Sequence, residues 1–465
     1  MLHPDRLLPA EPELRDIARS LYESVRDLPI ISPHGHTDPA WFAKNLPFED
    51  PVSLFILPDH YVFRMLYSQG VSLVELGITS ERSGSVENPR QVWRLFAEQY
   101  HLFRGTPTRV WLDQVFSELF DLTEPLTSAT ADSYFERISD ALRKPEYLPR
   151  ALFERFNIEL LATTESPLDT LPHHDALMED PWPGTVITTF RPDAVLDPEF
   201  EGFHENLNDL ARLTGIEVND YSGYLAALRD RREYFRQRGA IATDHGHPTP
   251  ATADLSEHEC EVLYQKIRLA KATPADAELF RAQMLTEMAA MSIEDGMVMQ
   301  IHPGSHRNHN SLIFDQYGRD MGADIPVMTN YVDGLKPLLN KFGNETDLTL
   351  ILFTLDETTY SRELAPLAGH YPILRLGPAW WFHDSPEGMR RFREQTTETA
   401  GFYNTAGFND DTRAFLSIPA RHDMSRRIDC GFLARLVAEH RLDEQEASEL
   451  AHALAYDLAK DAYNL

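Results

Sequence analysis

Two histidines one residue apart, in the segment His34-Gly35-His36, are the first residues of the chain whose types and spacing could do chemistry. In an extended strand, residues two apart point to the same side, so both imidazoles can face one metal ion. The glycine between them keeps the opposite side uncrowded. Such a pair also occurs as ordinary surface or capping histidines, so its meaning depends on the element that it ends. We predict that His34 and His36 are metal ligands because they end a short apolar run.

A carboxylate that could complete such a site stands near the far end of the chain, in Asn409-Asp410-Asp411-Thr412-Arg413. If this segment is extended, Asp411 and Arg413 share one face and Asp410 points to the other. An ordinary ion pair between Asp411 and Arg413 is the structural alternative. Two histidines, one carboxylate and open positions describe a catalytic divalent site, for which zinc is the usual ion. We therefore predict one divalent metal ion, Zn²⁺, held by the two histidines and Asp411.

These residues fall at the ends of short apolar runs, often rich in β-branched residues, that recur along the chain. We find eight of them, at 28–36, 158–164, 185–191, 240–245, 297–302, 348–356, 373–380 and 404–413. Near-continuous apolar strands suit a parallel sheet covered on both faces, and alternation with helices indicates βαβ units. Eight such units predict an α/β fold closed into a (β/α)8 barrel, whose active-site residues lie at the carboxyl ends of the strands.

The remaining run ends supply residue types that bind a substrate. Arg191 and Arg413 could clamp a carboxylate, because a guanidinium fork binds it through two hydrogen bonds. A structural ion pair is the alternative for each arginine. Further polar or aromatic residues at these ends, or close to them, are His60, Tyr61, Asp244, His302, Arg307 and Trp380.

A long stretch separates the first run from the second, and its apolar residues recur at helical spacing. We predict an α-helical insertion over residues 45–150 after the first strand. No linker rich in Pro, Gly or Ser flanks it, so residues 1–465 are predicted to form a single domain. Elsewhere, Thr273-Pro274 and Ser385-Pro386 predict the starts of two helices.

The charge balance argues against nucleic acids and membrane surfaces as partners. The chain has 465 residues, of which 73 are acidic and 43 basic, for a formal net charge of −30. Such a field repels phosphate backbones and anionic lipids, and no apolar run reaches the ~18 residues of a membrane span.

The two cysteines support neither a disulfide framework nor a cysteine zinc site. We expect a cytoplasmic protein, because the N-terminal segment lacks the apolar core of a secretion signal. The size is compatible with a homo-oligomer.

Taken in chain order, these pieces resemble the uronate isomerases of the amidohydrolase superfamily. The matching segments run along nearly the whole chain: His34-Gly35-His36, Asp59-His60-Tyr61, Thr163-Thr164-Glu165, Arg191-Pro192-Asp193, Asp244-His245-Gly246, Gln300-Ile301-His302, Arg307-Asn308-His309-Asn310, Trp380-Trp381-Phe382 and Asp411-Thr412-Arg413. The resemblance implies a distorted (β/α)8 barrel with one divalent metal ion, usually zinc, held by His34, His36 and Asp411. On both grounds we predict three catalytic residues, Tyr61, His302 and Asp411. The predicted substrate-binding residues are His60, Arg191, Asp244, Arg307, Trp380 and Arg413.

The reaction that the resemblance implies converts the aldehyde form of a hexuronate into its keto isomer. It takes D-glucuronate to D-fructuronate and D-galacturonate to D-tagaturonate. We predict proton transfer through an enediol, and a direct hydride shift is the mechanistic alternative.

Two other functions compete with this one. The first is a metal-dependent hydrolase of the same superfamily, such as a sugar lactonase. Many of those enzymes hold two metal ions bridged by a modified lysine after the fourth strand, where this chain has Asp244-His245. The second is a sugar-acid binding protein, which would not need a metal site of histidines and a carboxylate.

Overall fold

Seven parallel strands form the central sheet of the computed structural model, which describes residues 2–79 and 86–465. Neighbouring strands follow chain order, β1-β2-β3-β4-β5-β8-β9, as in a barrel. Their bounds are Ile30–Ser32, Ile158–Glu165, Thr185–Phe190, Ala242–His245, Val298–Ile301, Leu350–Leu352 and Leu374–Leu376. Each strand overlaps one of the first seven apolar runs of the sequence. Most strand residues are buried, as expected of a parallel sheet covered on both faces.

An extended segment after β9 takes the eighth position and closes the ring. Leu376 of β9 forms an isolated parallel bridge with Thr405, and the backbone N–H of His36 donates to the Thr412 carbonyl at 3.0 Å. The fold is therefore the predicted distorted (β/α)8 barrel. The prediction of a regular eighth strand over 404–413 is wrong. This segment is rich in Gly, Asn and Asp, and Asp411 has a left-handed backbone with φ of 39°, which interrupts a strand ladder.

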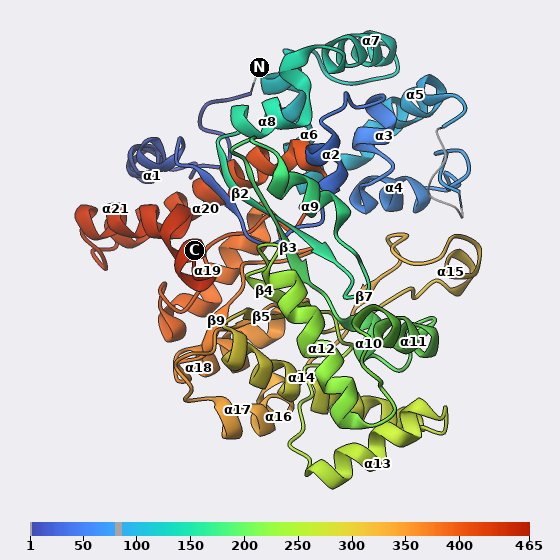
Figure 1. The fold of residues 1–465 in the computed structure, drawn as a ribbon. Coiled ribbons are helices and arrows are strands. Elements are labelled where there is room, and N and C mark those ends of the chain that lie inside the picture. The colour runs from blue at the N-terminus through green and yellow to red at the C-terminus, as the bar shows by residue number, and fades with distance from the viewer. Residues whose placement is uncertain (1, 80–85) are drawn as a thin grey trace.

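Helices alternate with the strands and cover the outside of the barrel (Figure 1). Those after β2 and β3 are α9 (Pro172–Glu179), α10 (Asp193–Leu196), α11 (Phe203–Thr214) and α12 (Tyr221–Arg236). Those after β4 and β5 are α13 (Glu257–Arg268), α14 (Pro274–Asp295), α15 (Ser311–Tyr317), α16 (Tyr331–Gly334) and α17 (Lys336–Phe342). α18 (Ala365–Ala368) follows β8, and α19 (Pro386–Ala400) follows β9. Thr273 caps α14 and Ser385 caps α19, which confirms both predicted helix starts.

A set of helices lies between β1 and β2, in dark blue to green in Figure 1, where the insertion was predicted. They are α2 (Pro39–Lys44), α3 (Pro51–Phe55), α4 (His60–Tyr67), α5 (Pro89–Gln99), α6 (Pro107–Gln114), α7 (Ala131–Leu142) and α8 (Pro149–Arg155). Their aromatic residues Trp93, Phe96 and Phe116 belong to one buried cluster with Ile30 of β1 and Leu161 of β2. The boundaries 45–150 and the single domain stay predictions.

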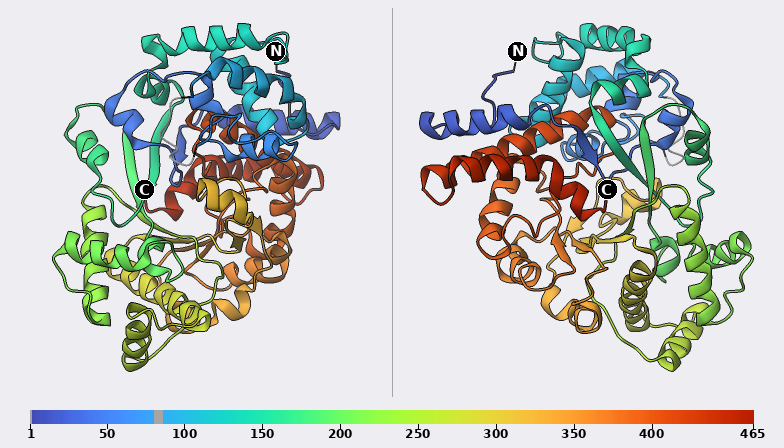
Figure 2. Two further views of the ribbon diagram at one scale, coloured as in Figure 1. Left: turned by 90° about the vertical axis from the view of Figure 1, so that its right-hand side faces the viewer. Right: turned by 60° about the vertical axis from the view of Figure 1, so that its left-hand side comes forward.

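Helices from the N-terminal and C-terminal regions of the chain pack together on one side of the barrel (Figure 2). α1 (Pro12–Val25) packs along α20 (Ile418–Ala438), which is followed by α21 (Glu444–His452) and α22 (Leu458–Ala462). Leu21 and Val25 share a buried cluster with Cys430 and Leu433. Within residues 2–79 and 86–465, no helix has the length and apolar character needed to cross a membrane.

A small antiparallel sheet, which the sequence did not predict, stands in the polar loop after β5. β6 (Ser305–His306) pairs with β7 (Ile325–Pro326). Strands of two residues are too short for any apolar alternation to reveal them. Their pairing brings the two sides of the loop together, so that Arg307 Nη1 lies 3.2 Å from Asp324 Oδ2.

Candidate active site

The loop after β1 presents His34 and His36 at the carboxyl end of the barrel. Thr164, near the end of β2, donates its hydroxyl to the Gly35 carbonyl at 2.9 Å. A Cβ atom on Gly35 would lie 3.3 Å from the Ala162 carbonyl oxygen, so a glycine allows the loop to approach β2 this closely. The loop is thus held between β2 on one side and Thr412 on the other.

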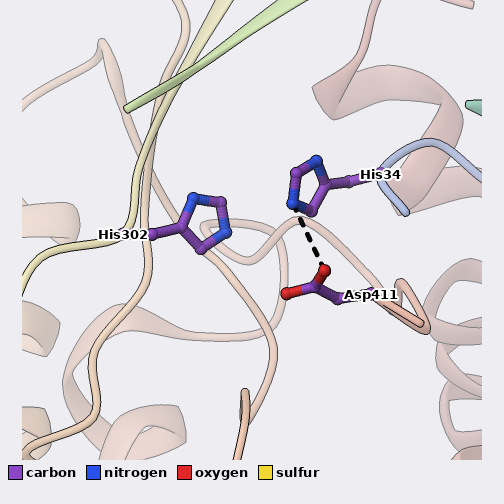
Figure 3. A group of neighbouring side chains, drawn as sticks. All are labelled: His34, His302 and Asp411. Carbon is purple, nitrogen blue, oxygen red and sulfur yellow. Dashed lines mark ion pairs between the residues drawn. The ribbon is translucent and has the colours of Figure 1, made fainter. Parts of the chain in front are cut away.

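Asp411 faces both histidines from the eighth segment. Its Oδ1 lies 3.5 Å from His34 Nε2 and 3.2 Å from His36 Nε2, and Figure 3 shows the carboxylate turned toward His34. The indole of Trp380 donates a hydrogen bond to Oδ2 of the same carboxylate. Burial raises the pKa of Asp411, but the neighbouring His34 and His36 outweigh burial and hold that pKa well below its usual range. Asp411 is therefore a carboxylate with its charge directed at the imidazoles.

Asp410, the adjacent acid, turns away from this cluster. Its Oδ2 accepts a hydrogen bond from His422 Nε2 of α20 at 3.1 Å. The two acids therefore point in different directions, as the parity argument expected. The cause differs from the expected one, because the backbone of Asp411 is left-handed and the segment is not a regular strand.

His302 follows β5 and lies beside His34 (Figure 3). Its ring is stacked on Phe353 with centroids 4.0 Å apart and on His34 with centroids 4.8 Å apart. His302 Nδ1 approaches Oδ1 of the fully buried Asp244 to 2.7 Å without hydrogen-bond geometry. Burial raises the pKa of Asp244, but Arg191 and His302 lower it further, so this carboxyl group is ionised.

The residues in this cluster fit a metal ion. One ligand atom each from His34, His302 and Asp411 lie within 4.8 Å of one another, and so do ligand atoms from His34, His36 and Asp244. Within the described part of the chain, His34 Nδ1 and both ring nitrogens of His302 are buried without a hydrogen-bond partner. Buried polar atoms are costly unless something satisfies them. A set of imidazoles and carboxylates with such unpartnered nitrogens suits a divalent cation.

A cavity of about 350 Å³ opens above the cluster, and Arg191, Arg307 and Arg413 are among the arginines that line it. Arg191 Nη1 lies 2.9 Å from Asp244 Oδ2, and Arg191 Nε lies 3.0 Å from Asp193 Oδ2. The other two are also paired, Arg307 with Asp324 and Arg413 with Asp320, each at 3.2 Å. The structural ion pairs considered for Arg191 and Arg413 are thus present, and Arg413 pairs with Asp320 rather than Asp411. Both guanidinium groups nevertheless lie on the cavity wall.

α4 brings His60 and Tyr61 to the same cavity. Asp59 caps this helix by accepting from the Tyr61 backbone N–H at 2.8 Å. The two rings stack with centroids 4.9 Å apart. Burial lowers the pKa of His60 to about 3, so its imidazole is neutral. Burial together with the nearby Asp384 holds the pKa of Tyr61 well above its usual value, so the phenol keeps its proton.

The structure thus brings the predicted site residues into one region, the buried cluster and the wall above it. Their roles stay predictions. The cavity is also lined by ionisable residues that the sequence analysis did not select, among them Glu165, Asp193, Asp384 and Arg421. Glu165 and Asp193 follow the second and third runs within two residues, so their position was a usable signal. Asp384 and Arg421 lie away from strand ends, and nothing in their spacing marked them.

The chain is similar to proteins of known family over nearly its whole length. The family model described as glucuronate isomerase matches residues 13–463. The chain is 65% identical over 464 residues to a uronate isomerase of Phenylobacterium zucineum, which covers 100% of this chain and 97% of the relative. The chain belongs to the glucuronate isomerase family. Like the family, it is an isomerase, and the hydrolase alternative has no comparable support.

Solved structures of the family have the same fold. The crystal structure of glucuronate isomerase from Caulobacter crescentus superimposes with a TM-score of 0.98 at 61% identity, covering 100% of this chain and 97% of that one. Uronate isomerase from Thermotoga maritima reaches a TM-score of 0.92 at 29% identity, covering 100% and 99%. The distorted barrel is therefore kept across widely diverged members.

Proposed function

We propose that this protein isomerises the open-chain aldehyde form of D-glucuronate to D-fructuronate, and that of D-galacturonate to D-tagaturonate. One observation carries the proposal beyond family membership. A single cavity combines guanidinium groups, which suit a sugar carboxylate, with a histidine and carboxylate cluster, which suits the reacting oxygens. In a chain with a net charge of −30, an anionic substrate needs such a local concentration of cations.

Arg191 and Arg413 are proposed to bind the substrate carboxylate. Arg191 contacts Asp193 through Nε and Asp244 through Nη1. These two contacts fix the plane of the guanidinium, whose Nη2 carries further N–H donors. A fork that is already oriented loses little freedom when it binds a carboxylate. His60, Arg307 and Trp380 are proposed to line the rest of the sugar site.

His34, His36 and Asp411 are proposed to hold one divalent ion, Zn²⁺. When bound, this ion would polarise the sugar oxygens and stabilise the negative charge that develops on them. The unpartnered Nδ1 of His34 and the two imidazoles around Asp411 Oδ1 support this ligand set. His302 and Asp244, which approach each other to 2.7 Å, lie directly beside it.

The proposed reaction moves protons between named atoms. Asp411 accepts the proton from C2 while the O1 oxygen gains one, which gives the enediol. The O2 proton then leaves and C1 gains a proton, which gives the ketose with the same atoms as the aldose. Tyr61 is proposed to donate to the sugar oxygen, and His302 to exchange protons with the oxygens at C1 and C2.

The deciding experiment incubates the purified protein with D-glucuronate and follows ketose formation. The expected result is D-fructuronate, with deuterium from solvent D₂O at C1. If the ketose carries no solvent deuterium, the mechanism is a direct hydride shift and not proton transfer through an enediol. If no ketose forms while a sugar lactone is hydrolysed, the proposed function is wrong. The cytoplasmic location and a homo-oligomeric state stay predictions.

A further inference from the structure

A second His-Gly-His segment, His245-Gly246-His247, stands at the end of β4, and the proposed reaction does not use it. Its two imidazole rings have centroids 6.0 Å apart and planes at 77°. The rings of His34 and His36 have centroids 5.3 Å apart and the same interplanar angle of 77°. A carboxylate faces the second pair as well, because Asp193 Oδ1 lies 4.0 Å from His247 Nε2. The residue types of the first cluster are thus repeated at the end of β4, three strands away from β1.

We propose that Asp193, His245 and His247 form a second binding site for a divalent cation. One ligand atom from each of the three lies within 4.8 Å of the other two. Tetrahedral ligands about 2.1 Å from an ion lie about 3.4 Å apart, so changes of up to about 1.4 Å in the distances between the ligand atoms would close the site. Two imidazoles and one carboxylate with an open position suit Zn²⁺, and Mn²⁺ less strongly.

The nitrogen atoms of this site are buried and available. His245 is 0% exposed and His247 3% exposed. Among the residues that the structure describes, no hydrogen-bond partner reaches His245 Nδ1 or either ring nitrogen of His247. His245 Nε2 lies 3.0 Å from Thr243 Oγ1, a contact that orients the ring and leaves Nδ1 for an ion. Burial lowers the pKa of both histidines, so the rings are neutral, as metal binding requires.

The charges around the pair favour a cation. Four carboxylates act on the two imidazoles, against two guanidinium groups: those of Asp193, Asp197, Asp244 and Glu278, against Arg232 and Arg281. Arg191 and Arg307 also reach Gly246 between the two histidines, and each is paired with a carboxylate, Arg191 with Asp193 and Arg307 with Asp324. The carboxylate of Asp193 faces the imidazoles directly, so an incoming divalent cation gains attraction while it replaces lost hydration with three ligands.

The site also reaches the substrate cavity. Asp193, Gly246 and His247 lie on the cavity wall. Both oxygens of Asp193 accept from the Gly246 backbone N–H at 3.1 Å, and Arg191 Nε donates to Oδ2 at 3.0 Å. An ion on Asp193 would therefore fix the guanidinium of Arg191. This positioning role rests on the proposed function, whereas binding of the ion does not.

The test measures bound metal by elemental analysis. Protein without an affinity tag is stripped by a chelator, loaded with Zn²⁺ or separately with Mn²⁺, and dialysed. Two equivalents per chain are expected for the wild type and for the control His258→Ala, whose histidine is exposed. One equivalent is expected for His247→Ala and for Asp193→Asn. A wild type that saturates at one equivalent, or His247→Ala that keeps two, overturns the proposal.

A second measurement does not depend on the folding of those variants. In the double variant with His34→Ala and His36→Ala, the second site is intact, so added Zn²⁺ should still raise Tm by at least about 2 °C. A Tm that does not respond to Zn²⁺ while the variant holds no metal contradicts the second site. Two bound equivalents in a wild type that forms no ketose would reject the proposed function and keep this site.

Discussion

The phenol of Tyr61 donates a hydrogen bond to Asp384 Oδ1 across 3.0 Å. The backbone N–H of Phe382 donates to the same phenol oxygen at 3.3 Å, and Arg421 Nη1 donates to Asp384 Oδ2 at 2.9 Å. Burial raises the pKa of Asp384 to about 6, although Arg421 lowers it. Tyr61 donates this hydrogen bond when Asp384 is ionised, whereas a protonated Asp384 can donate to the phenol oxygen instead. If Tyr61 is the proton donor proposed above, a neutral Asp384 would be placed to return a proton to the phenol oxygen as Tyr61 gives its own to the sugar.

Removal of the Tyr61 hydroxyl tests this donor role. Tyr61→Phe keeps the ring that stacks on His60 but has no proton to give. We expect kcat to fall by at least about tenfold with KM little changed, at the low end for a lost acid–base group. Tyr403→Phe, at an exposed tyrosine, is the matched control. An unaltered kcat in Tyr61→Phe would reduce this residue to packing.

The stability of the protein should fall between about pH 4.5 and pH 7 because of Glu165. Burial raises the pKa of this carboxyl from 4.5 to about 7, against hydrogen bonds from Thr163 and Thr188. The folded state therefore holds a proton in this range that the unfolded state has released, and stability is lost as pH rises through the folded pKa.

The comparison of wild type with Glu165→Gln isolates this group. The variant cannot ionise there, so its free energy of unfolding relative to the wild type should rise from pH 4.5 to pH 7.5. The rise should be on the order of 3 kcal/mol, measured by urea denaturation at each pH. Glu154→Gln, at an exposed glutamate, controls for the removal of a charge. A constant difference between wild type and Glu165→Gln would show that Glu165 is ionised throughout.

Arg191→Met should raise KM for D-glucuronate by at least about tenfold. The substituted side chain keeps apolar bulk but loses a charge-assisted contact of about 1.5–3 kcal/mol. Arg191→Lys keeps the charge without the fork and should recover only part of the loss. Arg229→Met, at an arginine whose ion pair with Glu294 is on the surface, is the control. A change in KM of only about two- to fourfold argues against a carboxylate clamp at Arg191.

Replacing both His34 and His36 by alanine should remove one equivalent of metal together with activity. Two proposed imidazole ligands are lost, and affinity for a divalent ion depends on ligand number. Elemental analysis and turnover of the same preparation measure the two effects. Metal content equal to that of the wild type would show that this cluster is not the metal centre. Loss of metal with turnover intact would make the ion structural.

Asp411→Asn should lower kcat by at least ~10²-fold with folding largely intact. The amide keeps the shape and one ligand oxygen but cannot accept the C2 proton. Asp410→Asn is the natural comparison, since Asp410 pairs with His422, whereas Asp411 faces His34 and His36. Its turnover is expected to exceed that of Asp411→Asn clearly. The reverse order of the two variants would move the proton acceptor to Asp410.

The regular part of the barrel could be predicted from the sequence, because each of the first seven strands is a short apolar run with polar residues after it. The eighth position could not be predicted as it is, because a left-handed residue such as Asp411 depends on contacts made far away in the chain. For the same reason Asp384 escaped notice. It lies just before a helix cap, and its role arises only from α4 and α20, which bring Tyr61 and Arg421 to it.

The hydrogen bond from His36 to Thr412 joins one segment that is synthesised early to another that is synthesised much later. During synthesis His34 and His36 are made before β2, but Asp411 is made only after all seven strands of the sheet, β1 to β9, have been made. The proposed centre of His34, His36 and Asp411 therefore cannot form before Asp411 has been made. A product truncated before residue 411 lacks the carboxylate and would compete poorly for scarce metal. If these three residues hold the metal ion as proposed, their order along the chain delays metal acquisition until the barrel is ready to close.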